Sequence, residues 1–146
     1  MNRINIAKLI GASESMMIEW KQSLSEINEI IETAAAFANT EGGRIFIGVS
    51  PEGMTLGVQI GKGTIEKLVN QIAQNTDPKL HPKVTTKKID GKDVLVVEVK
   101  ESYDHLVLAF GRPYKRVGRS TVKMSKDEYE RFIIDKNKDR IRFDNQ

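Results

Sequence analysis

The middle of the chain passes from a helical hydrophobic pattern into a short, almost continuous apolar run. Apolar residues recur at helical spacing over residues 27–38, and the pair Gly42-Gly43 follows. Glycine adopts positive φ without steric cost, so this pair ends the helix. Residues 44–49 are then rich in branched and aromatic side chains with little polar alternation. That pattern is typical of a strand covered on both faces, and we predict that it is the central strand of a sheet.

The same periodicity predicts two further helices. Ser23 with Glu26, and Ser125 with Glu128, have the capping-box spacing that marks a helix N-terminus. Between them, apolar residues recur at helical spacing after the Gly61-Lys62-Gly63 loop. We therefore expect helices that begin near residues 24, 64 and 126, and a loose charged tail over residues 136–146.

Alternation and turn residues predict the remaining strands. Asp90-Gly91 between two β-rich runs is a strong hairpin signal, and residues 50–53 read as a Pro-Glu-Gly turn. Helices interspersed with hairpins predict an α+β, mixed α/β fold, with a central mixed sheet and two to three packed amphipathic helices. The expected strands cover residues 16–21, 44–49, 54–58, 84–89, 94–100, 106–110 and 114–117.

Length and composition limit the class of protein. The 146 residues suffice for one domain with a core of its own, and the chain shows no long apolar run and no signal peptide. We expect a soluble, cytoplasmic protein without a membrane partner. The chain has no cysteine and only two histidines, which argues against disulfides and a zinc site.

Positive charge is concentrated in one segment. Residues 79–126 carry twelve Lys and Arg against five Asp and Glu, a net charge of +7, whereas the whole chain carries +3. Clustered basic residues attract polyanions. The charge distribution therefore favours a nucleic-acid partner, with a solvated β-rich surface as the alternative.

Three motifs resemble the Schlafen AlbA-type domain family. They are ESMMIEWK over residues 14–21, FANTEGGRIFIGV over 37–49 and YKRVGRST over 114–121. The resemblance extends over residues 14–122 and implies an AlbA-like fold, DNA binding at the front of a transcriptional regulator, and assembly into a homo-oligomer. It also implies a domain over 14–137 and a tail over 138–146 that begins a linker to further domains. Residues 1–13 carry apolar side chains, and we expect them to form an N-terminal arm that is a candidate dimer contact.

The candidate nucleic-acid contacts lie in the basic segment. Lysine and arginine neutralise phosphates, and a tyrosine among them can stack on a base. Without a recognition helix, we expect backbone contacts with weak sequence selectivity, to DNA first and to RNA as a second candidate. We expect the basic residues to converge into a single cationic surface, although strand alternation places Lys115 with Val117 on the face opposite Tyr114 and Arg116. The candidate contacts are Lys87, Lys88, Arg112, Tyr114, Lys115, Arg116, Arg119 and Lys123.

A metal-dependent nuclease is the enzymatic alternative, again by resemblance. Some Schlafen proteins cleave RNA with three acids, and Glu14 and Glu19 match the first two in spacing. Pro51 occupies the third position, with Glu52 beside it as a partial substitute. Such carboxylates would bind Mg²⁺ or Mn²⁺. The missing acid favours a non-enzymatic chain without a cofactor, in which Glu19 pairs with Lys21 or with an arginine of the basic hairpin. A non-catalytic oligomerisation or scaffold domain is the remaining alternative.

A phosphate-binding loop is not supported. Residues 57–64 are glycine-rich, but one residue is missing between the glycines and Gly63 stands where Ser or Thr would hold a metal. We therefore expect no nucleotide cofactor.

Overall fold

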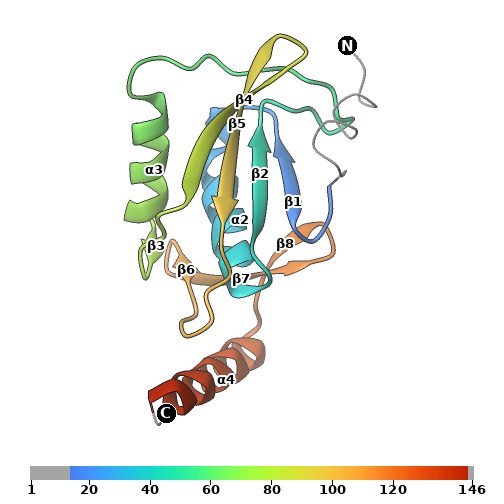
Figure 1. Ribbon diagram of the computed structural model, residues 1–146. Helices are drawn as coiled ribbons and strands as arrows, with labels where there is room; N and C mark the ends of the chain where they lie inside the picture. The colour runs from blue at the N-terminus through green and yellow to red at the C-terminus, as the bar shows by residue number, and fades with distance from the viewer. Residues whose placement is uncertain (1–13, 145–146) are drawn as a thin grey trace.

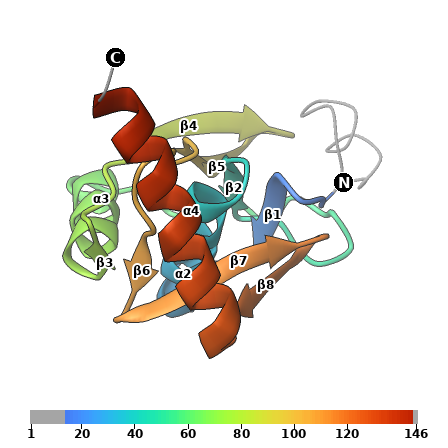
Figure 2. The ribbon, with the colours of Figure 1, turned by 90° about the horizontal axis from the view of Figure 1, so that it is seen from below.

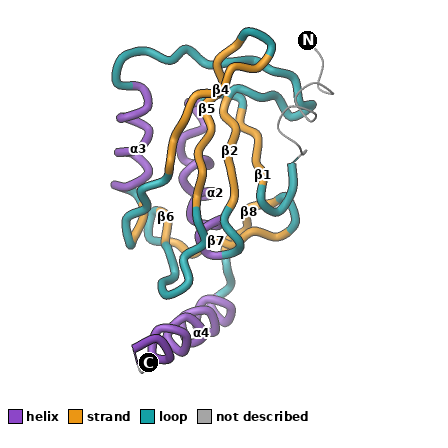
Figure 3. The backbone as a smooth tube through the Cα atoms, in the orientation of Figure 1, coloured by secondary structure: helices purple, strands orange, loops and turns teal. Residues whose placement is uncertain are grey.

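Two four-stranded sheets enclose one helix in the part of the chain, residues 14–144, that the computed structural model describes (Figure 1, Figure 3). Side chains are described through residue 138. The predicted mixed α/β fold class is confirmed. In chain order the elements are β1 (Ile18–Lys21), a 3-10 turn (Leu24–Glu26), α2 (Ile27–Asn39), β2 (Gly43–Ile47), α3 (Thr64–Gln74), β3 (Thr76–Asp77), β4 (Lys83–Ile89), β5 (Lys92–Val99), β6 (Leu108–Ala109), β7 (Arg112–Val117), β8 (Ser120–Lys123) and α4 (Lys126–Asp144).

The first sheet has the order β1-β2-β5-β4. Strand β1 is parallel to β2, whereas β2 with β5 and β5 with β4 are antiparallel. Ile45 pairs with Val97 and Phe46 pairs with Val96, so apolar residues line both faces of the two central strands. The prediction of a central buried strand is confirmed.

The second sheet has the order β3-β6-β7-β8, with antiparallel pairing throughout. It is made of short strands, and β8 consists of half-buried and exposed residues. Helix α2 lies between this sheet and the first one and contacts both (Figure 1, Figure 2). Nine of its 13 residues are consequently buried.

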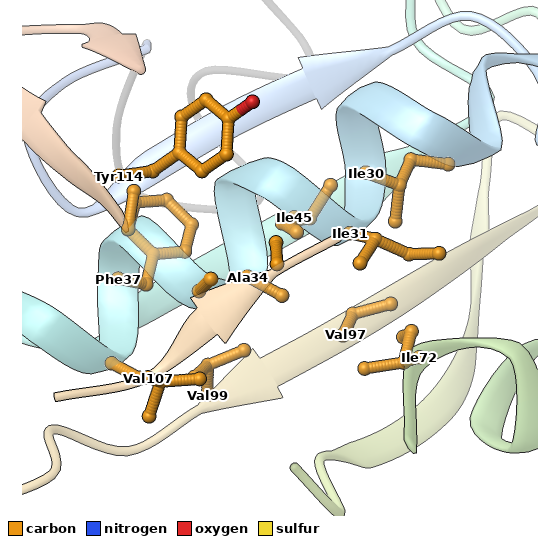
Figure 4. Close-up of a cluster of buried hydrophobic side chains, with 14 of the residues drawn as sticks. Ile30, Ile31, Ala34, Phe37, Ile45, Ile72, Val97, Val99, Val107 and Tyr114 are labelled. Carbon is orange, nitrogen blue, oxygen red and sulfur yellow. The ribbon is translucent and has the colours of Figure 1, made fainter. Parts of the chain in front are cut away.

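The main hydrophobic core surrounds α2 (Figure 4). Ile30 and Ile31 of the helix pack with Val97 of β5, and Phe37 packs towards the second sheet near Tyr114. Each large side chain that is fully buried stabilises the fold by roughly 1.5–3 kcal/mol. The core therefore attaches both sheets to the same helix.

Helix α4 begins as its sequence predicts. Ser125 Oγ accepts a hydrogen bond from the Glu128 N–H at 3.2 Å, and Glu128 Oε1 accepts one from the Ser125 N–H at 3.1 Å. This reciprocal pair is the capping box. At the other predicted box, Ser23 Oγ accepts from the Ser25 N–H, and the chain forms a 3-10 turn before α2.

The structure differs from the predicted elements in three respects. Residues 54–58 form no strand, and only an isolated bridge joins Val49 to Thr55. Strands β3 and β8 were not predicted, because β3 has two residues and β8 carries little apolar surface. Residues 136–144 continue helix α4 instead of forming a loose tail. The predicted N-terminal arm, residues 1–13, and the end of the predicted tail, residues 145–146, lie outside the described residues.

None of the helices within residues 14–144 is both long enough and apolar enough to span a membrane.

Candidate nucleic-acid interface

The motif YKRVGRST folds into the hairpin formed by β7 and β8, and its residues alternate between two faces. Arg116 pairs with Thr121 and Val117 pairs with Ser120 across the hairpin. Paired residues lie on the same face of a sheet, and neighbours along a strand point to opposite faces. Thr121 Oγ1 lies 3.0 Å from Thr33 Oγ1 of α2, so the face that carries Arg116 and Thr121 is turned towards that helix.

Arg116 is buried beneath the hairpin, with its side chain 0% exposed. Its Nη1 atom lies 2.7 Å from Glu19 Oε1, and Nη2 donates to the carbonyls of Ser15 at 2.9 Å and Ile18 at 3.0 Å. The guanidinium also lies 4.9 Å from the centre of the Phe37 ring. Because the guanidinium of Arg116 is buried and bound to these groups inside the protein, the prediction that this residue contacts phosphate is wrong.

Tyr114 and Lys115 are engaged as well. Tyr114 is 7% exposed, and its hydroxyl donates to Glu32 Oε2 at 3.1 Å. Burial, together with the Glu32 carboxylate, raises the pKa of this hydroxyl. Lys115, half-buried, forms an ion pair with Glu128 of α4. The prediction that Tyr114 stacks on a base is therefore wrong, because its ring belongs to the core.

Three of the predicted contacts on the hairpin remain exposed. Arg119 lies in the turn between β7 and β8, Lys123 ends β8, and Arg112 begins β7, where its side chain lies beside the Tyr114 hydroxyl. These three cations are exposed at the surface of one hairpin, and we call them the hairpin cations.

Lys87 and Lys88 lie on the other sheet, on its edge strand β4. Both are exposed, and Lys88 Nζ is 3.3 Å from Asp93 Oδ1. Figures 1 and 2 place β4 and β8 on opposite sides of α2. The expectation that all the candidate cations form a single surface is therefore wrong: they form two groups, one on each sheet.

The motif around residues 37–43 holds β7 in place. Asn39, at the end of α2, donates from Nδ2 to the carbonyls of Val107 and Tyr114, both at 2.8 Å, and its Oδ1 accepts from the Val107 N–H at 2.8 Å. Thr40 Oγ1 accepts from the Arg116 N–H at 3.0 Å. The sequence interpretation missed this role of Asn39 and Thr40; two polar residues directly after the apolar stretch 34–38 were the available signal.

We call Glu19, Phe37, Asn39, Thr40 and Arg116 the β7 anchor. All five side chains lie where β1, the end of α2 and β7 meet. The three motifs that carry the family resemblance therefore come together in a buried structural contact.

Two glycines let these segments approach one another. Gly42 has φ +75°, and its N–H donates to the Phe37 carbonyl at 2.7 Å, which ends the helix. A Cβ atom on Gly43 would lie 2.7 Å from the Met17 carbonyl oxygen and 2.8 Å from the Phe37 ring. This pair therefore serves close packing.

The acids of the nuclease alternative are occupied in other ways. Glu14 Oε2 accepts a hydrogen bond from the Trp20 N–H at 3.2 Å, and Glu19 pairs with Arg116. Burial, and the Glu14 carboxylate to which a protonated Glu19 donates, raise the pKa of Glu19 to about 7, against the opposing effect of Arg116. Glu52 is exposed in the turn after β2.

These residues do not fit a metal site. Within the described part of the chain, no three His, Cys, Asp or Glu side chains come together in a group that could hold a metal ion. A guanidinium already faces the Glu19 carboxylate, and Pro51 offers no ligand. The arrangement therefore favours the expected ion pair between Glu19 and an arginine of the basic hairpin.

A hollow of ≈ 590 Å³ opens where β2 begins and β5 ends. Its charged lining consists of three carboxylates, Glu41, Glu98 and Glu101, with two cations, Arg44 and Lys100. Because the carboxylates offset the cations, this hollow is a poorer phosphate site than the hairpin.

Comparison with known families decides the identity of this fold. The family model described as Schlafen, AlbA_2 matches residues 14–125, which contain all three motifs and the β7 anchor. The chain belongs to the Schlafen AlbA_2 family. No curated protein matches it.

Two solved structures resemble this AlbA_2 domain. The N-terminal domain of a protein from Nitrosomonas europaea, described as related to the ATP-dependent DNA helicase RecG, is 27% identical with a TM-score of 0.57. The match covers 86% of this chain and 95% of that one. The DIP2311 protein from Corynebacterium diphtheriae has the same fold, with a TM-score of 0.65 and 20% identity over 80% of this chain. This chain corresponds to 23% of the length of DIP2311.

Proposed function

We propose that this AlbA_2 domain binds duplex DNA through its phosphate backbone, with the hairpin cations as the main contacts. The observation that carries the proposal is that Arg112, Arg119 and Lys123 are exposed on one hairpin while its inward residues are fixed to α2. Such a hairpin presents cations on a rigid support, and neutralised phosphates release counterions. The likeness to a domain of a RecG-related protein supports a nucleic-acid partner.

In this proposal the domain is the DNA-binding module of a transcriptional regulator. Backbone contacts position a protein on DNA without reading sequence. We accordingly expect duplexes of different sequence to bind with similar affinity, and RNA to be the second candidate ligand. Assembly into a homo-oligomer, which family membership implies, is a separate part of the proposal, and sedimentation measures it.

The test compares two double variants that remove the same charge. Arg119→Gln with Lys123→Gln removes two hairpin cations, and Lys62→Gln with Lys67→Gln removes two exposed lysines near the start of α3. Fluorescence anisotropy with labelled duplex, single-stranded DNA and RNA is recorded over a range of salt concentrations. We expect the hairpin variant to lower the slope of log K against log salt by about 2, since each phosphate contact contributes about 0.9.

The control variant should retain the slope of the unmodified chain. Both variants should keep their stability within about 0.5 kcal/mol, because all four side chains are exposed. Equal slopes for the two variants would show that net charge, and not the hairpin, determines binding. A chain that binds none of the three nucleic acids at low salt would be a scaffold or oligomerisation domain instead.

A further inference from the structure

Strand β4 forms a second cationic edge, far from the hairpin. Among the strands of residues 14–144, it is the outer strand of the first sheet and pairs only with β5. Lys83, Lys87 and Lys88 are exposed along it, with the exposed Thr85 and Thr86 between them. Unpaired backbone N–H groups of an edge strand, hydroxyls and lysines are all groups that donate hydrogen bonds to phosphate.

The charges nearby leave this edge positive. Lys83 lies opposite Glu98 of the neighbouring strand β5, but Arg44 of β2 lies opposite Glu98 on the other side. The ion pair of Lys88 with Asp93 joins side chains that are 68% and 38% exposed, so solvent screens it. Residues 79–93 carry five lysines against two aspartates, a net charge of +3.

The spacing on β4 suits a nucleic-acid backbone. Lys83 and Lys87 lie on the same face, four residues apart, which is about 13 Å along a strand. Phosphates of one DNA strand follow one another every 3.4 Å or so along the duplex axis, so the two lysines are far enough apart to contact different phosphates. A hollow of ≈ 370 Å³ lies beside Lys83 at the start of β4, and its lining combines the polar His81, Glu98 and Lys100 with apolar residues.

We propose that β4 is a second duplex-binding site, so that one domain holds two segments of DNA, one on β4 and one on the β7–β8 hairpin. This inference rests on the proposed function for the hairpin. Helix α2 with its side chains is about 10–12 Å thick and separates the two sheets, so a duplex lying on one edge leaves the other edge free.

The test separates single-duplex binding from bridging. Anisotropy with one labelled duplex measures binding, and capture of a second, fluorescent duplex by a bead-bound duplex measures bridging. The variants are Lys83→Gln with Lys87→Gln on β4, the hairpin pair, and the control pair near the start of α3. We expect the β4 variant to lose bridging at least about tenfold, with less than about a threefold change in single-duplex affinity. The reason is that bridging needs both sites, whereas a single duplex can still bind the hairpin. The control variant should bridge like the unmodified chain.

Three results would overturn this inference. A chain that binds one duplex but never bridges has a single site. If the β4 variant still bridges, copies of the chain bridge through their hairpins. If the β4 variant also self-associates without DNA, the lysines of β4 only protect an exposed strand edge. Absence of binding even to one duplex would overturn the proposed function itself, and the single-duplex measurement distinguishes that case.

Discussion

The two sheets of this AlbA_2 domain are attached to the same helix by different means. Ile45, Ile47 and Val97 of the first sheet pack on α2 through apolar surface. Strand β7 of the second sheet is also fixed by polar contacts, above all those of Asn39 and Arg116. Hydrophobic burial is non-directional, whereas hydrogen bonds and ion pairs specify partners. The second sheet is therefore the part of the fold that a single polar substitution can detach.

The same comparison separates two arginines that are three residues apart. Arg116 points towards α2 and is buried, whereas Arg119 lies in the exposed turn of the same hairpin. Residue type alone would give both the same role. Their position on the hairpin assigns the first to structure and makes the second available to a ligand.

The largest expected effect is that of Arg116→Ala. Removing one partner of a buried ion pair leaves the other uncompensated, which costs about 3–5 kcal/mol. Glu19 would be left buried without its cation. Urea unfolding followed by circular dichroism at pH 8 measures this loss, and Arg119→Ala serves as the control within about 0.5 kcal/mol.

A second variant sharpens this prediction. Arg116→Met combined with Glu19→Leu removes both charges together, and apolar replacement of a whole buried pair is often neutral. We expect the double variant to be more stable than Arg116→Ala. Equal stability of Arg116→Ala and Arg119→Ala would mean that the buried ion pair does not hold the second sheet.

Asn39→Ala should have the next largest effect. It removes three hydrogen bonds and leaves buried backbone groups of Val107 and Tyr114 without partners. The expected loss is about 2–3 kcal/mol. Asn28→Ala, an exposed position on the same helix, is the control and should change stability by less than about 0.5 kcal/mol. Hydrogen exchange should also show faster exchange in β7 than in β5; uniform exchange across both sheets would contradict the separate attachment.

The smallest of the three effects is a pH dependence of stability that comes from Glu19. Its pKa is raised from 4.5 to about 7, mainly by burial and then by Glu14, with Arg116 opposing. The folded chain therefore binds this proton more tightly than the unfolded chain. The stabilisation is complete below pH 4.5 and is lost as the pH rises through about 7.

Comparison with Glu19→Gln isolates this contribution, because the variant cannot titrate at that position. Relative to Glu19→Gln, the unmodified chain should lose about 1–2 kcal/mol between acidic and mildly alkaline pH. Unfolding curves at several pH values measure the difference. A difference that stays constant, or that grows in favour of the unmodified chain as the pH rises, would contradict the raised pKa.

Local sequence patterns predicted the first sheet and the helices well. The apolar run of β2, the Asp-Gly turn between β4 and β5, and the capping box of α4 each act over a few residues. The second sheet is different, since β8 contributes little apolar surface and its neighbour β7 is fixed by partners far along the chain. Arg116 and Glu19 are 97 residues apart, and Asn39 and Tyr114 are 75 residues apart.

Only part of the candidate site was predicted, because its contacts also depend on residues far apart in the sequence. Clustered charge located the basic hairpin, but charge does not show which side of a strand faces the core. Alternation along β7 placed Lys115 and Val117 opposite Tyr114 and Arg116, yet only the position of α2 shows which pair is buried. The motif residues Asn39 and Thr40 had no visible role until their contacts with β7 were seen.

The central claim is that one hairpin divides its cations between structure and ligand. The most direct measurement compares Arg119→Gln with Arg116→Ala. For each variant, the change in unfolding free energy and the change in the salt slope of duplex binding are measured. We predict that Arg119→Gln lowers the slope by about 1 with stability unchanged, and that Arg116→Ala costs about 3–5 kcal/mol. An Arg119 variant with an unchanged slope, or one as unstable as Arg116→Ala, would contradict this division.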